Sequence, residues 1–349
     1  MTTDFGGDGE IGFEHDGLAG VVTLSRPASL NAVTHRMVLA LERALDAWRD
    51  DDGVSVVIIR AEGRAFSAGG DIVDIYRAGK AGNPPVQFFA DEYRLNAKIA
   101  TYPKPYMALI DGIAMGGGVG VSYHGSYRVV TENAVFAMPE VGIGFFPDVG
   151  GSHILPRLKG AIGMYLGLTG ARIRWGDQRW CGLATHAVES STLPLVIQEL
   201  ARTGNPRQAL HAHAANPERQ IDEARVFAIN KHFSLGSLDA VIASLEADAA
   251  GDAFAAETLA ALKIKSPTSL RVAFDQIEAG AALEIDECMR MEFRILNRML
   301  AGHDFYEGIR AAVIDKDNAP VWRPASLDEV DPAVIAAHFA PLPAGELRL

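Results

Sequence analysis

Residues 104–157 read KPYMALIDGIAMGGGVGVSYHGSYRVVTENAVFAMPEVGIGFFPDVGGSHILPR. This stretch combines an apolar strand pattern, a triple glycine where a helix is expected to begin, and two carboxylates, Glu140 and Asp148, in a loop rich in glycine and proline. Glycine lets the backbone approach another group closely because it has no Cβ atom. Carboxylates held among apolar groups are suited to acid–base chemistry. We therefore expect this stretch to carry the functional site.

Strand and helix patterns alternate around this stretch. Residues 11–26 predict a β-hairpin with a turn at Asp16-Gly17, and residues 34–48 carry apolar side chains at helical spacing behind Thr34, a candidate N-cap. Residues 54–60 predict a buried parallel strand. Further strands and helices are expected, in chain order, at 86–100, 106–110, 116–123, 127–131, 134–138 and 154–169. This alternation indicates an α/β fold.

The amino-acid composition changes near residue 194, where segments rich in alanine, leucine and glutamate begin. Helices are expected there at 195–203, 222–232, 238–248, 253–264 and 285–300, with a further helix starting at Ser266-Pro267. We expect a disordered tail at 1–9, an α/β core at 10–193 and a helical C-terminal region at 194–349.

Composition restricts the class of protein. The net charge of −12 comes from 32 basic and 44 acidic residues, which argues against non-specific binding to nucleic acid. The two cysteines, Cys181 and Cys288, are far apart and form no CxxC pair, so we expect reduced thiols rather than a zinc or disulfide framework. The N-terminus lacks a signal-peptide pattern and no apolar run could span a bilayer, which predicts a cytoplasmic protein without membrane segments.

Two glycine-rich segments share one pattern, FSAGGD at 66–71 and AMGGGVG at 114–120. Each follows a predicted strand and precedes a predicted helix, where backbone N–H groups have no partner within the helix. Two such N–H groups that converge on one point would form an oxyanion hole for an ester or thioester carbonyl. The alternative is that the glycines only allow a helix and a strand to pack closely.

Several common catalytic patterns are missing from the sequence. It contains no GxGxxG fingerprint, because Val121 stands where the third glycine belongs, and it contains no P-loop, HExxH or GxSxG pattern. This removes the common nucleotide-binding and serine-hydrolase interpretations.

The loop 138–151, MPEVGIGFFPDVGG, surrounds Glu140 and Asp148 with apolar side chains. Such surroundings raise the pKa of a carboxyl group, which is what a general acid or base needs near neutral pH. The alternative interpretation is structural: Glu140 caps the following segment, and Asp148 forms an Asx-turn after Pro147.

With these motifs the chain resembles the crotonase (enoyl-CoA hydratase/isomerase) superfamily, over roughly residues 10–190. Within it, SPTSL at 266–270 and GHDFYEGIRAAVIDKD at 302–317 are similar to the 3-hydroxyisobutyryl-CoA hydrolases rather than to the shorter hydratases. The resemblance implies a crotonase-like spiral of stacked ββα turns, followed by a helical region. It also implies hydrolysis of a 3-hydroxyacyl-CoA thioester in valine catabolism.

The resemblance assigns roles to individual residues. It implies that the N–H groups of Ala68 and Gly117 form the oxyanion hole, and that Glu140 and Asp148 are the catalytic carboxylates. Residues implied to contact substrate are Glu92, Gly69, Gly70, Asp71 and Gly116. CoA would be part of the substrate, so neither a separate cofactor nor a metal ion is expected. A homo-oligomer, a trimer or a hexamer, would follow from the same resemblance.

One departure from the hydratase pattern favours hydrolysis. Hydratases carry a first catalytic glutamate three residues after the middle glycine of GGG, and here that position is Gly120. Asp148 stands where hydratases usually have glycine. Glu140 would either activate a water molecule or attack the thioester carbonyl itself. Two alternatives remain: an enoyl-CoA hydratase or isomerase of the same fold, and a non-catalytic acyl-CoA-binding module.

Overall fold

The computed structural model describes residues 3–343 and 345–349. The chain forms two compact units, each built from several separate segments. Unit 1 comprises Met1–Asp71, Asp91–Phe136 and Ile173–Gln220, and unit 2 comprises Ile72–Ala90, Ala137–Arg172 and Ile221–Leu349. The chain therefore does not divide at residue 193 as expected from its composition, because two segments of the expected core pack with the C-terminal helices.

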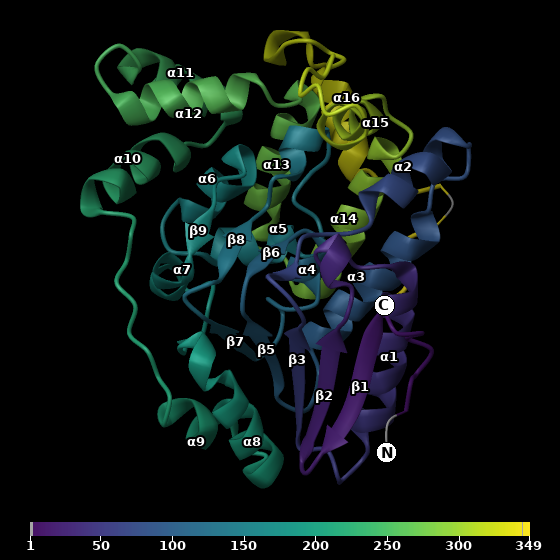
Figure 1. Ribbon diagram of the computed structural model, residues 1–349. Coiled ribbons are helices and arrows are strands. Elements are labelled where there is room, and N and C mark those ends of the chain that lie inside the picture. Colours follow the sequence, from purple (N-terminus) through teal and green to yellow (C-terminus); the bar gives the residue numbers. More distant parts are fainter. Residues whose placement is uncertain (1–2, 344) are drawn as a thin grey trace. The chain divides into compact units, whose positions relative to one another are not determined.

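Unit 1 is organised around a six-stranded sheet (Figure 1). Its strands, in spatial order, are β1 (Ile11–Asp16), β2 (Ala19–Leu24), β3 (Val56–Ala61), β5 (Tyr106–Ile110), β7 (Tyr127–Val130) and β10 (His186–Ala187). The first two form the predicted antiparallel hairpin, and the others pair in parallel. Strand β5 is buried along its whole length, as expected for a parallel strand covered on both faces.

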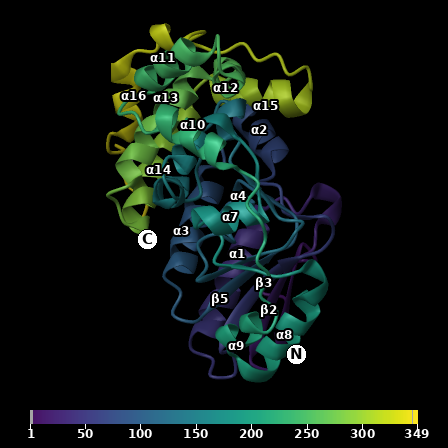
Figure 2. The same cartoon turned by 90° about the vertical axis from the view of Figure 1, so that its left-hand side faces the viewer.

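Helices cover the sheet of unit 1. Helix α1 (His35–Arg49) is capped by the side chain of Thr34, as predicted, and buries an apolar face against the hairpin. Helices α8 (Leu193–Thr203) and α9 (Pro206–His211) pack into one apolar cluster with β2, β3, β5 and β7 (Figures 1 and 2). Unit 1 also contains α7 (Trp175–Cys181) and most of α3 (Val86–Ala100).

A second, smaller sheet holds the glycine-rich segments. Its order is β4 (Ala65–Ser67), β6 (Ile113–Met115), β8 (Val135–Ala137) and β9 (Ile173–Arg174). Strands β4 and β6 are parallel neighbours, so the chain leaves both in the same direction. Helix α4 (Gly117–Gly120), which follows β6, is only one turn long, shorter than the predicted 116–123 helix.

The expected tail at 1–9 is ordered where the structure describes it, from residue 3; residues 1 and 2 lie outside the described residues. Phe5 packs edge-on against Phe13 and Trp48, with ring centroids 5.1 and 5.9 Å away. Arg43 donates a hydrogen bond to the Phe5 carbonyl. The prediction of disorder was wrong for this segment. It was based on the local glycine and acidic residues, whereas Phe5 packs on side chains that are distant in the sequence.

Unit 2 is mainly helical. Its helices are α2 (Ile72–Lys80), α5 (Gly151–Ile154), α6 (Ile162–Thr169), α10 (Glu223–Phe233), α11 (Leu238–Asp248), α12 (Ala253–Lys263), α13 (Pro267–Gly280), α14 (Ile285–Met299), α15 (Asp304–Ile309) and α16 (Pro332–Phe339). Helices α11 and α12 lie side by side, and α13 packs on α5 and α6 (Figure 1). The single helix predicted at 154–169 is interrupted, because Leu155–Arg157 forms a 3-10 turn containing Pro156, and Gly160 has a left-handed φ of 61°.

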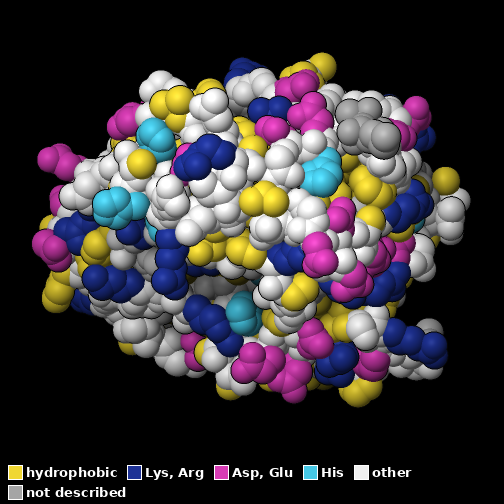
Figure 3. Space-filling model, turned by 90° about the horizontal axis from the view of Figure 1, so that it is seen from below, with side chains coloured by type: hydrophobic (Ala, Val, Ile, Leu, Met, Phe, Trp, Pro, Cys, Tyr) yellow, Lys and Arg dark blue, Asp and Glu magenta, His cyan; other side chains and the backbone are white. Residues whose placement is uncertain are grey.

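Three further observations bear on the expectations from composition. Both cysteines are buried free thiols, as expected. No helix among the described residues is long and apolar enough to cross a membrane. On the face shown in Figure 3, basic and acidic side chains are interspersed and hydrophobic side chains occur in small groups.

Candidate functional site

The two glycine-rich segments lie next to each other in unit 1. Ser67 at the end of β4 is registered with Ala114 of β6. A Cβ atom added to Gly118 would lie 2.4 Å from the Ser67 carbonyl oxygen, so the two backbones are in direct contact there. Gly116 has φ 46° and ψ −126°, a backbone conformation that side chains disfavour. Close packing, the structural alternative for these glycines, therefore explains Gly118, and the backbone conformation explains Gly116.

Gly117 faces a different neighbour. A Cβ atom at this position would lie 2.8 Å from Glu92 Oε1 and 3.3 Å from Val33 Cβ. Glu92 comes from helix α3 and is 2% exposed. As the first residue of α4, Gly117 has an N–H group with no partner inside its helix. A buried carboxylate and a helix-start N–H group thus lie together, which the sequence offered no reason to expect before the family resemblance named Glu92.

The N–H group of Ala68 does not fit the donor role that the resemblance implied. It donates to the Leu30 carbonyl at 3.0 Å and is therefore already engaged within the fold. Leu30 and Asn31 adopt left-handed φ values of 50° and 54°, which brings this turn against the segment after β4. Ala68 is corrected from an oxyanion donor to a residue that anchors its segment.

Gly70 points its N–H group the other way. Val33 donates to the Gly69 carbonyl at 2.8 Å, and Asp71 donates to the Val33 carbonyl at 3.2 Å, which makes a parallel bridge between Val33 and Gly70. In such a bridge the N–H group of the middle residue faces away from the partner strand. The Gly70 N–H group therefore points away from the bridge, whereas that of Ala68 is engaged by Leu30. Val33 lies beside both Gly70 and Gly117.

Asp71 has a structural partner. Arg26 donates to the Asp71 carboxylate at 3.1 Å and to the Ala32 carbonyl at 2.6 Å. The ion pair ties the segment after β4 to the turn that precedes α1. These contacts support a bracing role for Asp71 rather than the substrate contact that the resemblance implied, and they occupy Arg26.

In unit 2, Glu140 opens the 3-10 turn Glu140–Ile143 and is 6% exposed. Among the described residues its Oε2 atom has no hydrogen-bond partner. Burial raises the pKa of Glu140 well above its usual value, and the negative charges of Asp148 and Glu292 raise it further. The carboxyl group is therefore held in the poorly solvated state that the apolar loop predicted, and the capping alternative leaves this unexplained.

Asp148 is 4% exposed and lies in the loop between that turn and α5. The next residue, Val149, has a left-handed φ of 49°, which is rare for a β-branched side chain and costs on the order of 1–3 kcal/mol. Gly150 follows with φ 84°. The loop around Asp148 is thus strained and must be held by contacts elsewhere in unit 2.

Those contacts come from residues that sequence reasoning did not single out. Glu292 of α14 accepts hydrogen bonds from the N–H groups of Gly150 (2.8 Å) and Ser152 (3.0 Å), and from the Ser152 hydroxyl (2.5 Å). Gln276 of α13 donates to the Pro147 carbonyl at 2.6 Å. One signal was available: Glu292 interrupts the buried face of α14, whose other members are apolar residues and Cys288.

The C-terminal motifs at 266–270 and 302–317 also contact the carboxylate segment. The Ser266 hydroxyl donates to Asp304 at 2.6 Å, which links the two motifs. A Cβ atom on Gly144 would lie 2.1 Å from the Asp304 carbonyl oxygen, and one on Gly308 would lie 2.2 Å from the Ile143 carbonyl carbon. Helix α15 therefore packs backbone to backbone on the turn that carries Glu140.

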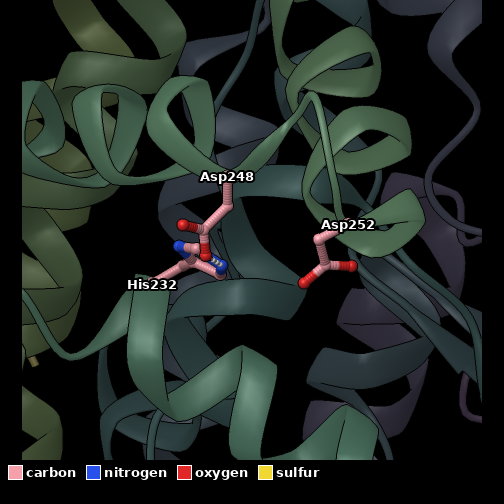
Figure 4. A group of neighbouring side chains, drawn as sticks. All are labelled: His232, Asp248 and Asp252. Carbon is pink, nitrogen blue, oxygen red and sulfur yellow. Dashed lines mark ion pairs between the residues drawn. The ribbon is translucent and has the colours of Figure 1, made fainter.

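One cluster in unit 2 has the donor types of a metal site. Figure 4 shows His232, Asp248 and Asp252, whose ligand atoms lie within 4.8 Å of one another. The Lys231 ammonium group forms an ion pair with Asp248, and Asp252 accepts from the Phe254 N–H group as the N-cap of α12. The acidic groups are therefore already engaged by a cation and a helix cap, which explains the cluster as structural.

Sequence comparison relates the chain to known proteins over nearly its whole length. Residues 19–339 match the family described as enoyl-CoA hydratase/isomerase. A mitochondrial 3-hydroxyisobutyryl-CoA hydrolase of Danio rerio is 44% identical, over 97% of this chain and 92% of its own length. The human protein of the same name is 41% identical, over 97% and 90%.

Solved structures show the same fold. A structure described as a carnitinyl-CoA dehydratase from Mycobacterium thermoresistibile has a TM-score of 0.91 and 40% identity, covering 97% of this chain and 98% of that one. A structure described as an enoyl-CoA hydratase from Rhodobacter sphaeroides has a TM-score of 0.88 and 40% identity, covering 97% and 100%. The predicted crotonase-like α/β fold is confirmed, and the chain belongs to the enoyl-CoA hydratase/isomerase (crotonase) family.

Proposed function

We propose that the protein hydrolyses 3-hydroxyisobutyryl-CoA, a 3-hydroxyacyl thioester, to the free hydroxy acid and CoA. The observation that carries the proposal is the pair of buried carboxyl groups, Glu140 and Asp148, in one loop of unit 2. Relatives that are 41–44% identical over nearly the whole chain are named 3-hydroxyisobutyryl-CoA hydrolases. The family match supports an acyl-CoA substrate.

The oxyanion hole is proposed to consist of the N–H groups of Gly70 and Gly117. The family resemblance supplies the role. The backbone directions favour Gly70 over Ala68, because the Ala68 N–H group already donates to Leu30. Two donors aimed at the thioester oxygen stabilise the charge that develops there when the carbonyl carbon is attacked, and losing one such donor costs about 10²–10³-fold in rate.

Glu140 is proposed as the residue that starts the reaction. Its carboxylate either takes a proton from water, which attacks the carbonyl carbon, or attacks that carbon itself to form a mixed anhydride that water then opens. In both routes the carbon–sulfur bond breaks, CoA leaves as a thiolate that acquires a proton, and the acid is released. The raised pKa of Glu140 makes it a stronger base than an exposed carboxylate.

Asp148 is proposed to accept a hydrogen bond from the 3-hydroxyl group of the substrate or to share proton transfer with Glu140. Its charge is close enough to raise the pKa of Glu140. Glu92 beside Gly117 is proposed to contact the substrate near the oxyanion hole. No separate cofactor is expected for this reaction, and CoA would enter only as part of the substrate.

The alternative function is hydration of an enoyl-CoA, and two solved structures at 40% identity are described as a dehydratase and a hydratase. Gly120 argues against it for this chain. Addition of water across a double bond by the hydratase route uses two carboxylates, and glycine stands at the position of the first one. Asp148 stands at a different position in the sequence and does not restore the carboxylate missing at position 120.

Three finer expectations stay with this proposal. The reaction is expected to belong to valine catabolism, as the family resemblance implies. The relatives are named mitochondrial, so a cytoplasmic location for this protein is a prediction that fractionation of its host must test. A trimer or hexamer is expected from the family, and sedimentation would measure it.

A thiol-release assay across a panel of acyl-CoA esters tests the proposal. Purified protein should release CoA from 3-hydroxyisobutyryl-CoA faster than from isobutyryl-CoA, which lacks the hydroxyl group. Asp148→Asn should lower release from the hydroxylated ester while the far-UV and near-UV circular dichroism stay unchanged. Absence of thiol release from every ester, with tight binding of the same esters, would instead support a non-catalytic acyl-CoA-binding module.

A further inference from the structure

The loop that carries Asp148 is held on both sides by the C-terminal helices. On its N-terminal side, the side-chain amide of Gln276 donates to the Pro147 carbonyl at 2.6 Å. On its C-terminal side, the Gly150 N–H group donates to Glu292 at 2.8 Å. Asp148 and the left-handed Val149 lie between these two points.

Glu292 is an unusual residue in this place. It is 0% exposed, and burial raises its pKa to about 7 although three hydrogen bonds lower it. Burying a carboxylate is costly unless several donors satisfy it. Here all three donors, two backbone N–H groups and the Ser152 hydroxyl, belong to Gly150 and Ser152, which follow Asp148 in the same segment.

Gln276 is also buried, at 0% exposed, and its amide oxygen has no hydrogen-bond partner among the described residues. An apolar side chain of similar size would avoid that unsatisfied atom, so the residue is costly apart from its bond to Pro147. Helix α13 approaches closely enough to make this bond because Gly280 lies against Ser152, where an added Cβ atom would be 1.9 Å from the Ser152 carbonyl oxygen.

We propose that Gln276 and Glu292 are positioning residues that clamp the backbone on either side of Asp148 and so fix the direction of its carboxylate. The inference rests on the proposed function, because it acts through Asp148. It also gives the C-terminal helices a part in the reaction: they hold a strained loop in the one conformation that presents Asp148. Misplacing a reacting group by about 1 Å can cost on the order of 10²-fold in rate.

A double-mutant cycle tests the clamp. Glu292→Gln places an amide N–H₂ group opposite the Gly150 or Ser152 donors, and Gln276→Met removes the bond to Pro147. Each variant is made in the wild-type and in the Asp148→Asn background, and kcat for thiol release from 3-hydroxyisobutyryl-CoA is measured. Glu278→Gln, at an exposed position of α13 two residues after Gln276, is the matched control.

In the wild-type background, Glu292→Gln should lower kcat by on the order of 10²-fold and Gln276→Met by about tenfold. In the Asp148→Asn background each should lower it by about twofold or less, because the carboxylate they position is no longer there. The control should match the wild type. Equal losses in both backgrounds would overturn the clamp, and so would full activity in a folded Glu292→Gln protein.

The remaining outcomes distinguish failure of the clamp from failure of the proposed function. If Glu292→Gln does not fold, Ser152→Ala decides, because it removes only the hydroxyl donor; the clamp predicts a loss that again disappears in the Asp148→Asn background. If the wild type releases no thiol, or Asp148→Asn retains full activity, the proposed function of Asp148 fails, and the clamp fails with it. If Asp148→Asn lowers hydrolysis but the losses from Asp148→Asn and from the clamp variants simply add, the clamp alone is refuted.

Discussion

The glycine segments of unit 1 and the carboxylate loop of unit 2 solve different chemical problems. The segments after β4 and β6 offer backbone N–H groups, and Gly117 and Gly118 must be glycine because neighbouring groups lie where a Cβ atom would be. The loop after β8 offers two side-chain carboxyl groups and buries both. A backbone donor cannot be removed by truncating a side chain, whereas a carboxylate can.

The two regions are sensitive to different kinds of substitution. Adding atoms damages the glycine segments, because Glu92 and Ser67 occupy the space beside Gly117 and Gly118. Removing or neutralising a carboxylate should damage the carboxylate loop, because the roles proposed for Glu140 and Asp148 depend on charge. Substitutions that add or neutralise therefore separate the two regions.

The largest effect is expected from Glu140→Gln. The amide keeps the size of the side chain but cannot act as a base or nucleophile, so thiol release should fall by on the order of 10⁴-fold. Steady-state assays with saturating 3-hydroxyisobutyryl-CoA measure it, with circular dichroism as the control for folding. Activity near that of the wild type would remove Glu140 from the mechanism.

Gly117→Pro should follow, because it deletes the backbone N–H group proposed for the oxyanion hole. A loss of about 10²–10³-fold in kcat is expected from the donor alone. Gly117→Ala is the matched variant, since it adds a Cβ atom toward Glu92 but keeps the N–H group. If alanine and proline at this position lower kcat equally, crowding rather than the donor is responsible.

The pH dependence of kcat should reveal the raised pKa of Glu140. Burial and the nearby Asp148 raise that pKa above its ordinary value of 4.5, so the group takes up a proton at a higher pH than an exposed glutamate. Activity should therefore fall on acidification, about tenfold per pH unit below the raised pKa. A rate that stays constant down to pH 4.5 would show that the ionised form of a buried Glu140 is not needed.

Gly144→Ala should destabilise unit 2. Gly144 has φ 70°, and an added Cβ atom would lie 2.1 Å from the Asp304 carbonyl oxygen, so both backbone strain and overlap with α15 oppose alanine. A loss of about 1–3 kcal/mol in the free energy of unfolding is expected. Gly182→Ala shares the positive φ but meets open space, so in urea titrations its smaller loss measures the strain alone.

The smallest effect concerns stability rather than rate. The folded state binds a proton on Glu140 more tightly than the unfolded state does, so the wild type loses stability as pH rises from 4.5 through the raised pKa. Glu140→Gln lacks this loss and should gain stability relative to the wild type above that window. Urea midpoints at pH 4.5 and pH 8 check the sign, and a stability difference independent of pH would contradict it.

Much of this could be predicted from local sequence patterns. The hairpin, the Thr34 cap, the parallel strands and the helix at Ser266-Pro267 each depend on residues close in sequence. The glycine-rich segment at 114–120 and the loop around Glu140 could be singled out because glycine spacing and apolar neighbours are themselves local signals, and the family resemblance then named Gly117. These predictions did not need to know which distant segments meet.

What failed depended on contacts between distant segments. The Ala68 N–H group is engaged by Leu30, whose left-handed conformation has no sequence signature. Glu292 reaches the Asp148 loop from 140 or more residues away, and its pattern on α14 shows only an acid on an apolar face. The expected boundary at 193 failed for the same reason. Composition changes along the chain do not show which distant segments pack together in space.

Two reactions assayed on one preparation separate hydrolysis from hydration. Wild-type protein is given 3-hydroxyisobutyryl-CoA while thiol release is followed, and crotonyl-CoA while loss of the double bond is followed. Two carboxylates at positions 140 and 148, with glycine at 120, predict thiol release and little hydration, and Glu140→Gln should abolish the release. Rapid hydration without thiol release would contradict the account.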